Sequence, residues 1–272
     1  MTATSVHPAR PFKLGRNKPL ARGMRLRFGD FLLASAPPPP PATENYLRSG
    51  SGGVYAAMED VLANDAHSCC TCSGAGHILD ILRANSAKPW RHATAADVLA
   101  FYARVTNPPF NPETGENDNG ADEQTVLNVW KGGFFQDGSG KIEAWATLNA
   151  SSPLEIKQAL WLFGNVYFGV PMPDAWVSPM PSASGFVWGP AGAPDDSNGH
   201  AFIGYGYNAS GVFIDTWGLF GTVTWEAIAK YCAAGVGELH VVLGEEWADA
   251  AATKAPGGVN VSQLRAYIAT LF

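Results

Sequence analysis

The order of the expected secondary-structure elements constrains the fold most. Apolar residues recur at helical spacing in the first half of the chain, whereas the second half is dominated by short alternating or buried strands. Helices are expected at 71–85, 94–102, 123–130, 153–163 and 225–233, and strands at 142–148, 166–170, 200–207, 212–217, 222–224 and 239–243. Helices followed by mostly antiparallel strands predict an α+β fold. With 272 residues, 46% of them hydrophobic, the chain has enough apolar material for a sizeable core.

The first fifty residues differ from the rest in charge and in proline content. The chain has 18 basic and 24 acidic residues, and seven of the basic ones lie in residues 1–28, which contain no acid. Five consecutive prolines, Pro37–Pro41, then favour an extended conformation. We therefore divide the chain into a basic, proline-rich arm at 1–50 and a body at 51–272. Since residues 29–272 contain 11 basic against 24 acidic residues, we expect the arm to fold back along the body and not to bind nucleic acid.

Several classes of protein are disfavoured by the sequence. No apolar run reaches the roughly 20 residues that span a bilayer, so no membrane span is expected. Basic residues near the N-terminus are not followed by an apolar run, so we expect no secretory signal and a cytoplasmic or virion-associated location. The acidic loop at 113–123 lacks the alternating ligand spacing of a calcium loop. We expect neither a metal nor a cofactor.

Three of the four cysteines are clustered at the start of an expected helix. Cys69, Cys70 and Cys72 fall within four positions, and Cys232 is remote. A thiol at a helix N-terminus is close to the positive end of the helix dipole, which favours the reactive thiolate. This pattern does not resemble a disulfide framework, and it makes Cys70 a candidate nucleophile.

A cysteine nucleophile needs an imidazole and a group that orients it. His200 begins one expected strand, and Asp215 lies near the end of the next, so a hairpin turning at 208–211 brings both to one end. Asp215 would then accept a hydrogen bond from His200. Asn64, six residues before Cys70, supplies an amide donor for an oxyanion.

These stretches resemble the papain-like cysteine peptidases. The segments His200-Ala-Phe-Ile-Gly-Tyr-Gly-Tyr and Ile214-Asp-Thr-Trp-Gly are similar to the histidine strand and the Asn-Ser-Trp-Gly segment of that family. The spacing from Asn64 to Cys70 is that of the family's oxyanion glutamine and its cysteine. Further likeness at 13–27, 64–71, 74–77 and 114–120 resembles a phage- and bacteria-encoded branch. The resemblance implies a papain-like fold, a Cys70–His200–Asp215 triad, and a peptide or protein substrate.

The sequence departs from the family pattern around the cysteine. The family's Cys-Gly-Ser-Cys-Trp is replaced by Cys-Cys-Thr-Cys-Ser at 69–73. A competing register makes Cys72 the nucleophile, but it puts Ala66 at the oxyanion position, where no side-chain donor exists. We therefore favour Cys70. Asn64 and Asp215 replace the family's glutamine and asparagine.

Other readings of the same residues stay open. Cys70 could be an inert buried thiol, and Cys69, Cys70, Cys72 and His77 could hold zinc, although adjacent cysteines do not match zinc-ligand spacing. The long loop at 171–199, with anchors at Trp176, Phe186 and Trp188, is typical of a functional or lid-like segment. A second function class is a catalytically vestigial virion protein that docks through the arm and a short C-terminal helix at 262–272.

Overall fold

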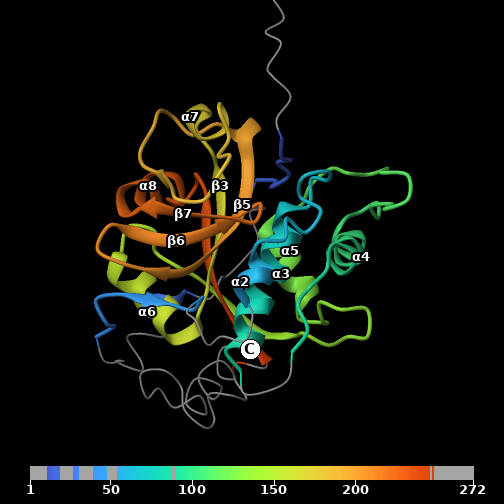
Figure 1. The fold of residues 1–272 in the computed structure, drawn as a ribbon, viewed down its shortest axis with the longest axis horizontal. Helices are drawn as coiled ribbons and strands as arrows, with labels where there is room; N and C mark the ends of the chain where they lie inside the picture. The colour runs from blue at the N-terminus through green and yellow to red at the C-terminus, as the bar shows by residue number, and fades with distance from the viewer. Residues whose placement is uncertain are drawn as a thin grey trace, which may run out of the picture.

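The computed structural model describes residues 11–18, 27–30, 39–47, 54–86, 90–245 and 247. The helix expected at 262–272 lies outside these residues. Two parts stand side by side in Figure 1: helices α3, α4 and α5 form one, and a twisted sheet with helices α6, α7 and α8 forms the other. This is the α+β arrangement that the order of the elements predicts.

The helical part is built around one central helix, α3. It contains α2 (Val54–Met58), α3 (Cys70–Ala84), α4 (Ala95–Val105) and α5 (Glu123–Trp130). Every residue of α3 from Cys70 to Leu82 is buried, so this helix is enclosed on all sides. The helix α4 begins at the expected capping box, in which Thr94 and Asp97 exchange side-chain and backbone hydrogen bonds.

Within the described residues, the sheet has eight strands in the order β2-β8-β3-β5-β6-β7-β4, and β1 pairs with β5. The strands are β1 (Glu44–Asn45), β2 (Ile142–Thr147), β3 (Val166–Pro171), β4 (Phe186–Trp188), β5 (Gly199–Tyr207), β6 (Gly211–Thr216), β7 (Leu219–Thr224) and β8 (Glu238–Gly244). The helices on this side are α6 (Pro153–Phe163), α7 (Asp174–Val177) and α8 (Trp225–Tyr231). All described strand pairs are antiparallel except β4 with β7.

The hairpin of β5 and β6 contains a bulge. Tyr207 pairs with Val212 at the turn, whereas Ile203 pairs with Asp215 farther along, and the register shifts between Gly204 and Gly206. Because β5 contains one extra residue, the side chains of β6 beyond the bulge lie on the opposite face of the sheet from the one that regular pairing would give them.

The segment at 171–199 is more ordered than the expected loop. It contains α7, the edge strand β4 and a short 3₁₀ helix, Asp196–Asn198. Trp176 and Trp188 are buried and stack with their ring centroids 4.7 Å apart, as expected of anchors. The prediction of one continuous loop is therefore wrong, because a three-residue parallel strand has too little alternation to be recognised.

The two parts meet where α3 packs against the sheet. A Cβ at Gly74 would lie 3.1 Å from Tyr167 and 3.3 Å from Ile203, so glycine permits the close approach of helix and strands. This contact positions the first residue of α3 beside the start of β5. Among the described residues, no helix has the length and apolar character needed to cross a membrane.

Candidate active site

Cys70 is the first residue of α3 and faces the start of β5. A backbone hydrogen bond from Ala201, the residue after His200, reaches its thiol. The other two clustered cysteines have different partners: Cys69 Sγ lies 3.8 Å from Leu62 O, and the Cys72 thiol forms a hydrogen bond with the side chain of Thr71. Of the three thiols, only Cys70 is connected to the strand that carries His200.

The Cys70 thiol is neutral in this structure. Burial raises its pKa to about 12, although the backbone hydrogen bond from Ala201 opposes the shift. Burial also raises the pKa of Cys72 well above its ordinary value. The stabilisation of a thiolate by the helix N-terminus is therefore outweighed by desolvation while the site is covered.

His200 is held through one of its two ring nitrogens. Its Nε2 lies 2.7 Å from Thr216 Oγ1, and the ring stacks on Trp217 with centroids 4.2 Å apart. Its Nδ1 is buried and has no hydrogen-bond partner. Desolvation lowers the pKa of His200 to about 3, so the imidazole is neutral.

Asp215 does not accept the hydrogen bond from His200 that the sequence predicts. Neither of its carboxyl oxygens takes part in a hydrogen bond, and Oδ2 lies 3.3 Å from His77 Nε2 on α3. Because Asp215 pairs with Ile203 and Thr216 is the next residue, their side chains point to opposite faces of β6. Burial raises the pKa of Asp215 well above its ordinary value.

Asn64 lies in the turn before α3, where its side chain is used locally. Its Nδ2 donates to His67 O at 3.0 Å, and its backbone carbonyl accepts a hydrogen bond from Lys13. The side chain is buried. An amide carries two N–H donors, and the His67 carbonyl takes one of them.

A stretch of the arm lies between the two parts, beside Cys70 and His200. We call residues 11–18 the inserted segment; it is the dark blue chain at the upper boundary of the two parts in Figure 1. Its Gly15 and Arg16 backbone N–H groups donate to Gly199 O at 3.2 and 3.1 Å. On the opposite wall, Ala121 N donates to Gly15 O, and Asn17 N donates to Ala121 O, both at 2.9 Å. The inserted segment thus forms main-chain hydrogen bonds with both walls.

The inserted segment also packs closely over the two candidate catalytic residues. Phe12 stacks on Trp217 with ring centroids 5.0 Å apart, and Trp217 in turn stacks on His200. Gly15 passes so near the backbone before Cys70 that a Cβ on it would lie 2.0 Å from Ser68 O. This contact contributes to the burial of Cys70 and His200, each about 1% exposed.

Within residues 11–18, basic side chains of the arm contact acids of the body, as the charge asymmetry predicts. The Arg16 guanidinium lies between Glu123 and Glu238, at 3.3 and 3.4 Å, and Lys18 pairs with Asp196 at 2.6 Å. Sequence reasoning did not single out Thr216, Glu123 or Glu238. The charge asymmetry was a signal for Arg16, but it could not show which basic residue meets which acids.

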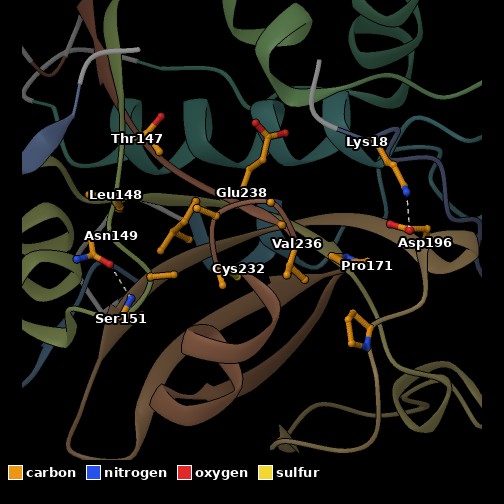
Figure 2. A pocket seen from close by; sticks show the side chains of 17 residues that line it. Lys18, Thr147, Leu148, Asn149, Ser151, Pro171, Asp196, Cys232, Val236 and Glu238 are labelled. Atoms are coloured by element: carbon orange, nitrogen blue, oxygen red, sulfur yellow. Dashed lines mark hydrogen bonds and ion pairs between the residues drawn. The ribbon is translucent and has the colours of Figure 1, made fainter. Parts of the chain in front are cut away.

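A pocket of about 620 Å³ lies next to the inserted segment. Figure 2 shows Lys18 and Asp196 joined at its rim and Glu238 in its wall, with the carboxylate directed toward the helical part. Cys70 and His200 do not line this pocket. Within the described residues, no group of three or more metal-ligating side chains is arranged to hold an ion.

Comparisons with known proteins were made by sequence and by structure. No family model and no curated protein sequence matches this chain. Its structure is similar to xylellain, a cysteine protease from Xylella fastidiosa, with a TM-score of 0.57 and 13% identity over 88% of this chain and 99% of that one.

A second similar structure is digestive procathepsin L2 proteinase from the larval midgut of Tenebrio molitor. Its TM-score is 0.55 at 13% identity, over 87% of this chain and 76% of that one. Identity at this level establishes similarity of fold only. The chain therefore has the fold of the papain-like cysteine proteases.

Proposed function

We propose that this chain is a cysteine peptidase, or a related amidase, with Cys70 as nucleophile and His200 as general base. Three features of the site support this proposal. Cys70 begins a helix, His200 has one nitrogen held and the other without a partner, and the cleft beside them accommodates an extended peptide. The substrate class is a peptide or a related amide.

The proposed reaction proceeds through an acyl-enzyme. Cys70 Sγ forms a bond to the amide carbonyl carbon, and the C–N bond then breaks. His200 Nδ1 takes the thiol proton and delivers it to the departing amine. Water next attacks the thioester while His200 accepts its proton, which releases the acid and restores the thiol.

Two further side chains have supporting roles in this proposal. Thr216 holds His200 Nε2, which leaves Nδ1 as the nitrogen that exchanges protons. Asn64 and the backbone N–H of Cys70 stabilise the oxyanion, since one amide hydrogen of Asn64 is not used by His67. Asp215, placed against His77, has no direct part in the reaction.

The inserted segment holds the proposed enzyme in a latent state. With it in place, both the thiol and the imidazole are desolvated and neutral. Release of the segment admits water, which lowers the cost of the charged thiolate and imidazolium. The same release opens the cleft to a substrate.

One observation carries the proposal. The inserted segment is itself a peptide, and its main chain hydrogen-bonds to Gly199 on one wall and Ala121 on the other. Gly199 directly precedes His200. A cleft that binds a peptide backbone next to a cysteine and a histidine is suited to hydrolysing a peptide bond.

The test is site-mapped alkylation by iodoacetamide on the full reduced chain, across pH of about 4 to 9. Wild-type protein is compared with Gly15→Ala, whose added Cβ meets Ser68 O at 2.0 Å and so displaces the inserted segment. We expect Cys70 to be protected in the wild type. In Gly15→Ala it should react fastest of the cysteines and stay reactive well below the ordinary thiol pKa of ~8.5. Adding His200→Ala should remove this reactivity.

Gly189→Ala is the matched control, because nothing lies within 4 Å of the Cβ it would add. Trypsin cleavage after Arg16 reports independently whether the inserted segment has left the cleft. The enzyme proposal fails if the inserted segment has left the cleft and Cys70 is still inert. It also fails if Cys70 then titrates as an ordinary thiol whether or not His200 is present. The chain would then fit the vestigial assembly protein that the sequence also allowed.

A further inference from the structure

The side chain of Arg16 fills a buried acidic site, and its backbone N–H donates to Gly199 O, directly before the candidate catalytic histidine. Arg16 Nε lies 3.3 Å from Glu123 Oε2, and Nη2 lies 3.4 Å from Glu238 Oε1. All three side chains are at most 1% exposed. We call the space between Glu123 and Glu238, with Gly169 and Gly199 at its walls, the arginine pocket.

We propose that the arginine pocket selects an arginine side chain of the peptide substrate, and that Arg16 occupies it in the latent protein as a substrate would. The inference rests on the proposed function and specifies the substrate class. It is carried by the position of the pocket, its charge and its shape.

The position of the pocket links it to the peptide-binding main chain. Arg16 is the residue whose backbone lies between the two walls, donating to Gly199 O and flanked by the hydrogen bonds of Gly15 and Asn17 with Ala121. A peptide that replaced the inserted segment on these hydrogen bonds would direct one side chain into the same pocket. A simple electrostatic tether would need no such main-chain docking.

The pocket is acidic, which suits a guanidinium. Burial raises the pKa of Glu123 well above its ordinary value, although the charge of Arg16 opposes this shift. Burial also acts to raise the pKa of Glu238, but hydrogen bonds and charge from His240, together with Gln124, lower it to about 2. The pocket therefore presents a carboxylate at Glu238, with which an arginine can form a charged pair.

The shape of the pocket favours arginine over lysine. The two acceptors come from α5 and β8, and they contact two different nitrogens of one guanidinium. A lysine ammonium is a single point of charge and could not reach both in this way. A Cβ at Gly169 would lie 2.0 Å from Glu123 Oε1, so the absence of a side chain there makes room for the acid.

The pocket is not saturated by Arg16. Both contacts to the guanidinium are longer than usual for a charged pair. A substrate arginine could therefore bind closer to the two carboxyl groups than Arg16 does. This difference would help a substrate to replace the inserted segment.

The experiment uses full-length Gly15→Ala and three sets of fluorogenic peptide amides. Within a set, each peptide carries the test residue at a different position. The test residue is arginine in the first set, lysine in the second, and citrulline, whose neutral urea replaces the guanidinium, in the third. We expect kcat/KM for arginine to exceed that for citrulline roughly 30-fold or more at one position, as for loss of one partner of a buried charged pair. Glu238→Gln should remove most of this preference, whereas the exposed Glu226→Gln should not.

A second measurement tests the pocket without turnover. Arg16→Ala in the full chain vacates the pocket, and ethylguanidinium should then raise its Tm more than the neutral ethylurea does. Wild-type protein, whose pocket is filled, should show no such difference. This readout does not depend on any reaction at Cys70.

The outcomes separate this inference from the proposed function. If Gly15→Ala reacts with iodoacetamide at Cys70 but hydrolyses arginine and citrulline peptides equally, the arginine pocket is overturned and the enzyme proposal stands. If Cys70 is inert, the enzyme proposal fails and the pocket is judged by binding alone. Equal effects of ethylguanidinium and ethylurea on Arg16→Ala would then overturn it.

Discussion

His200 and Thr216 are joined by a hydrogen bond of 2.7 Å between the imidazole Nε2 and the threonine hydroxyl. Both side chains lie on the face of the sheet that carries Trp217, which stacks on His200. With Nε2 engaged, the remaining nitrogen, Nδ1, is the one without a partner. The hydroxyl therefore fixes the ring orientation that the proposed reaction needs.

This contact predicts different effects for two neighbouring substitutions. Thr216→Val removes the hydroxyl at nearly constant volume and should lower kcat in the Gly15→Ala background roughly tenfold or more, since an unheld imidazole loses its orientation. Thr216→Ser should restore most of the rate. Asp215→Asn, which changes the side chain against His77, should leave kcat within about twofold. Loss of activity in Asp215→Asn with full activity in Thr216→Val would assign the orienting role to Asp215 instead.

The buried Asp215 predicts a pH-dependent stability difference. Burial raises the pKa of this carboxyl well above its ordinary value of 3.8, so the folded state keeps a proton that the unfolded state loses above that pH. Its contribution is therefore fully present below pH of about 4 and is lost as pH rises toward the folded pKa. Asp215→Asn removes this loss.

We therefore expect the stability of Asp215→Asn relative to wild type to increase from pH 5 to pH 7. The slope should approach about 1.4 kcal/mol per pH unit. Urea unfolding at the two pH values measures the difference. Asp60→Asn is the control, because Asp60 is another acid whose charge affects the pKa of His77. A difference between the Asp215→Asn variant and wild type that does not change with pH would mean that Asp215 is ionised in the fold.

The position of Asp215 differs from the one expected from the sequence because of one bulge. If the pairing of Tyr207 with Val212 continued regularly, Asp215 would oppose Gly204 and share a face with Phe202 and His200. The bulge pairs it with Ile203 instead, which turns it toward α3. Nothing in the local pattern marks the position of the extra residue.

Elements with local end signals were predicted well. Helix α6 begins at Pro153 behind the cap residue Ser152 and ends before Gly164, and its bounds agree with the expected ones. By contrast, Arg16 meets acids that are 107 and 222 positions away. Such a contact depends on the complete fold, so charge asymmetry could predict only that the arm follows the body.

The identity of the nucleophile is tested by single cysteine substitutions in the Gly15→Ala background. Cys70→Ala should abolish hydrolysis, because its thiol is the one that faces Ala201. Cys72→Ala should keep the reaction but reduce the free energy of unfolding by about 1 kcal/mol, since it removes a fully buried sulfur from the core. The two effects are separated by measuring kcat/KM and urea unfolding on the same samples. Retained hydrolysis in Cys70→Ala would point to Cys72.

Displacement of the inserted segment can also be forced from the opposite wall. A Cβ at Gly199 would lie 2.1 Å from the backbone oxygen of Arg16, so Gly199→Ala should expel the segment as Gly15→Ala does from its own side. In both variants we expect trypsin to cleave after Arg16 at least roughly tenfold faster than in wild type, because cleavage needs a locally open backbone. Gly189→Ala should behave as wild type. Equal protection of Arg16 in all four proteins would show that the segment tolerates these changes within the cleft, and that its fit there is looser than the contacts with Ser68 and Gly199 imply.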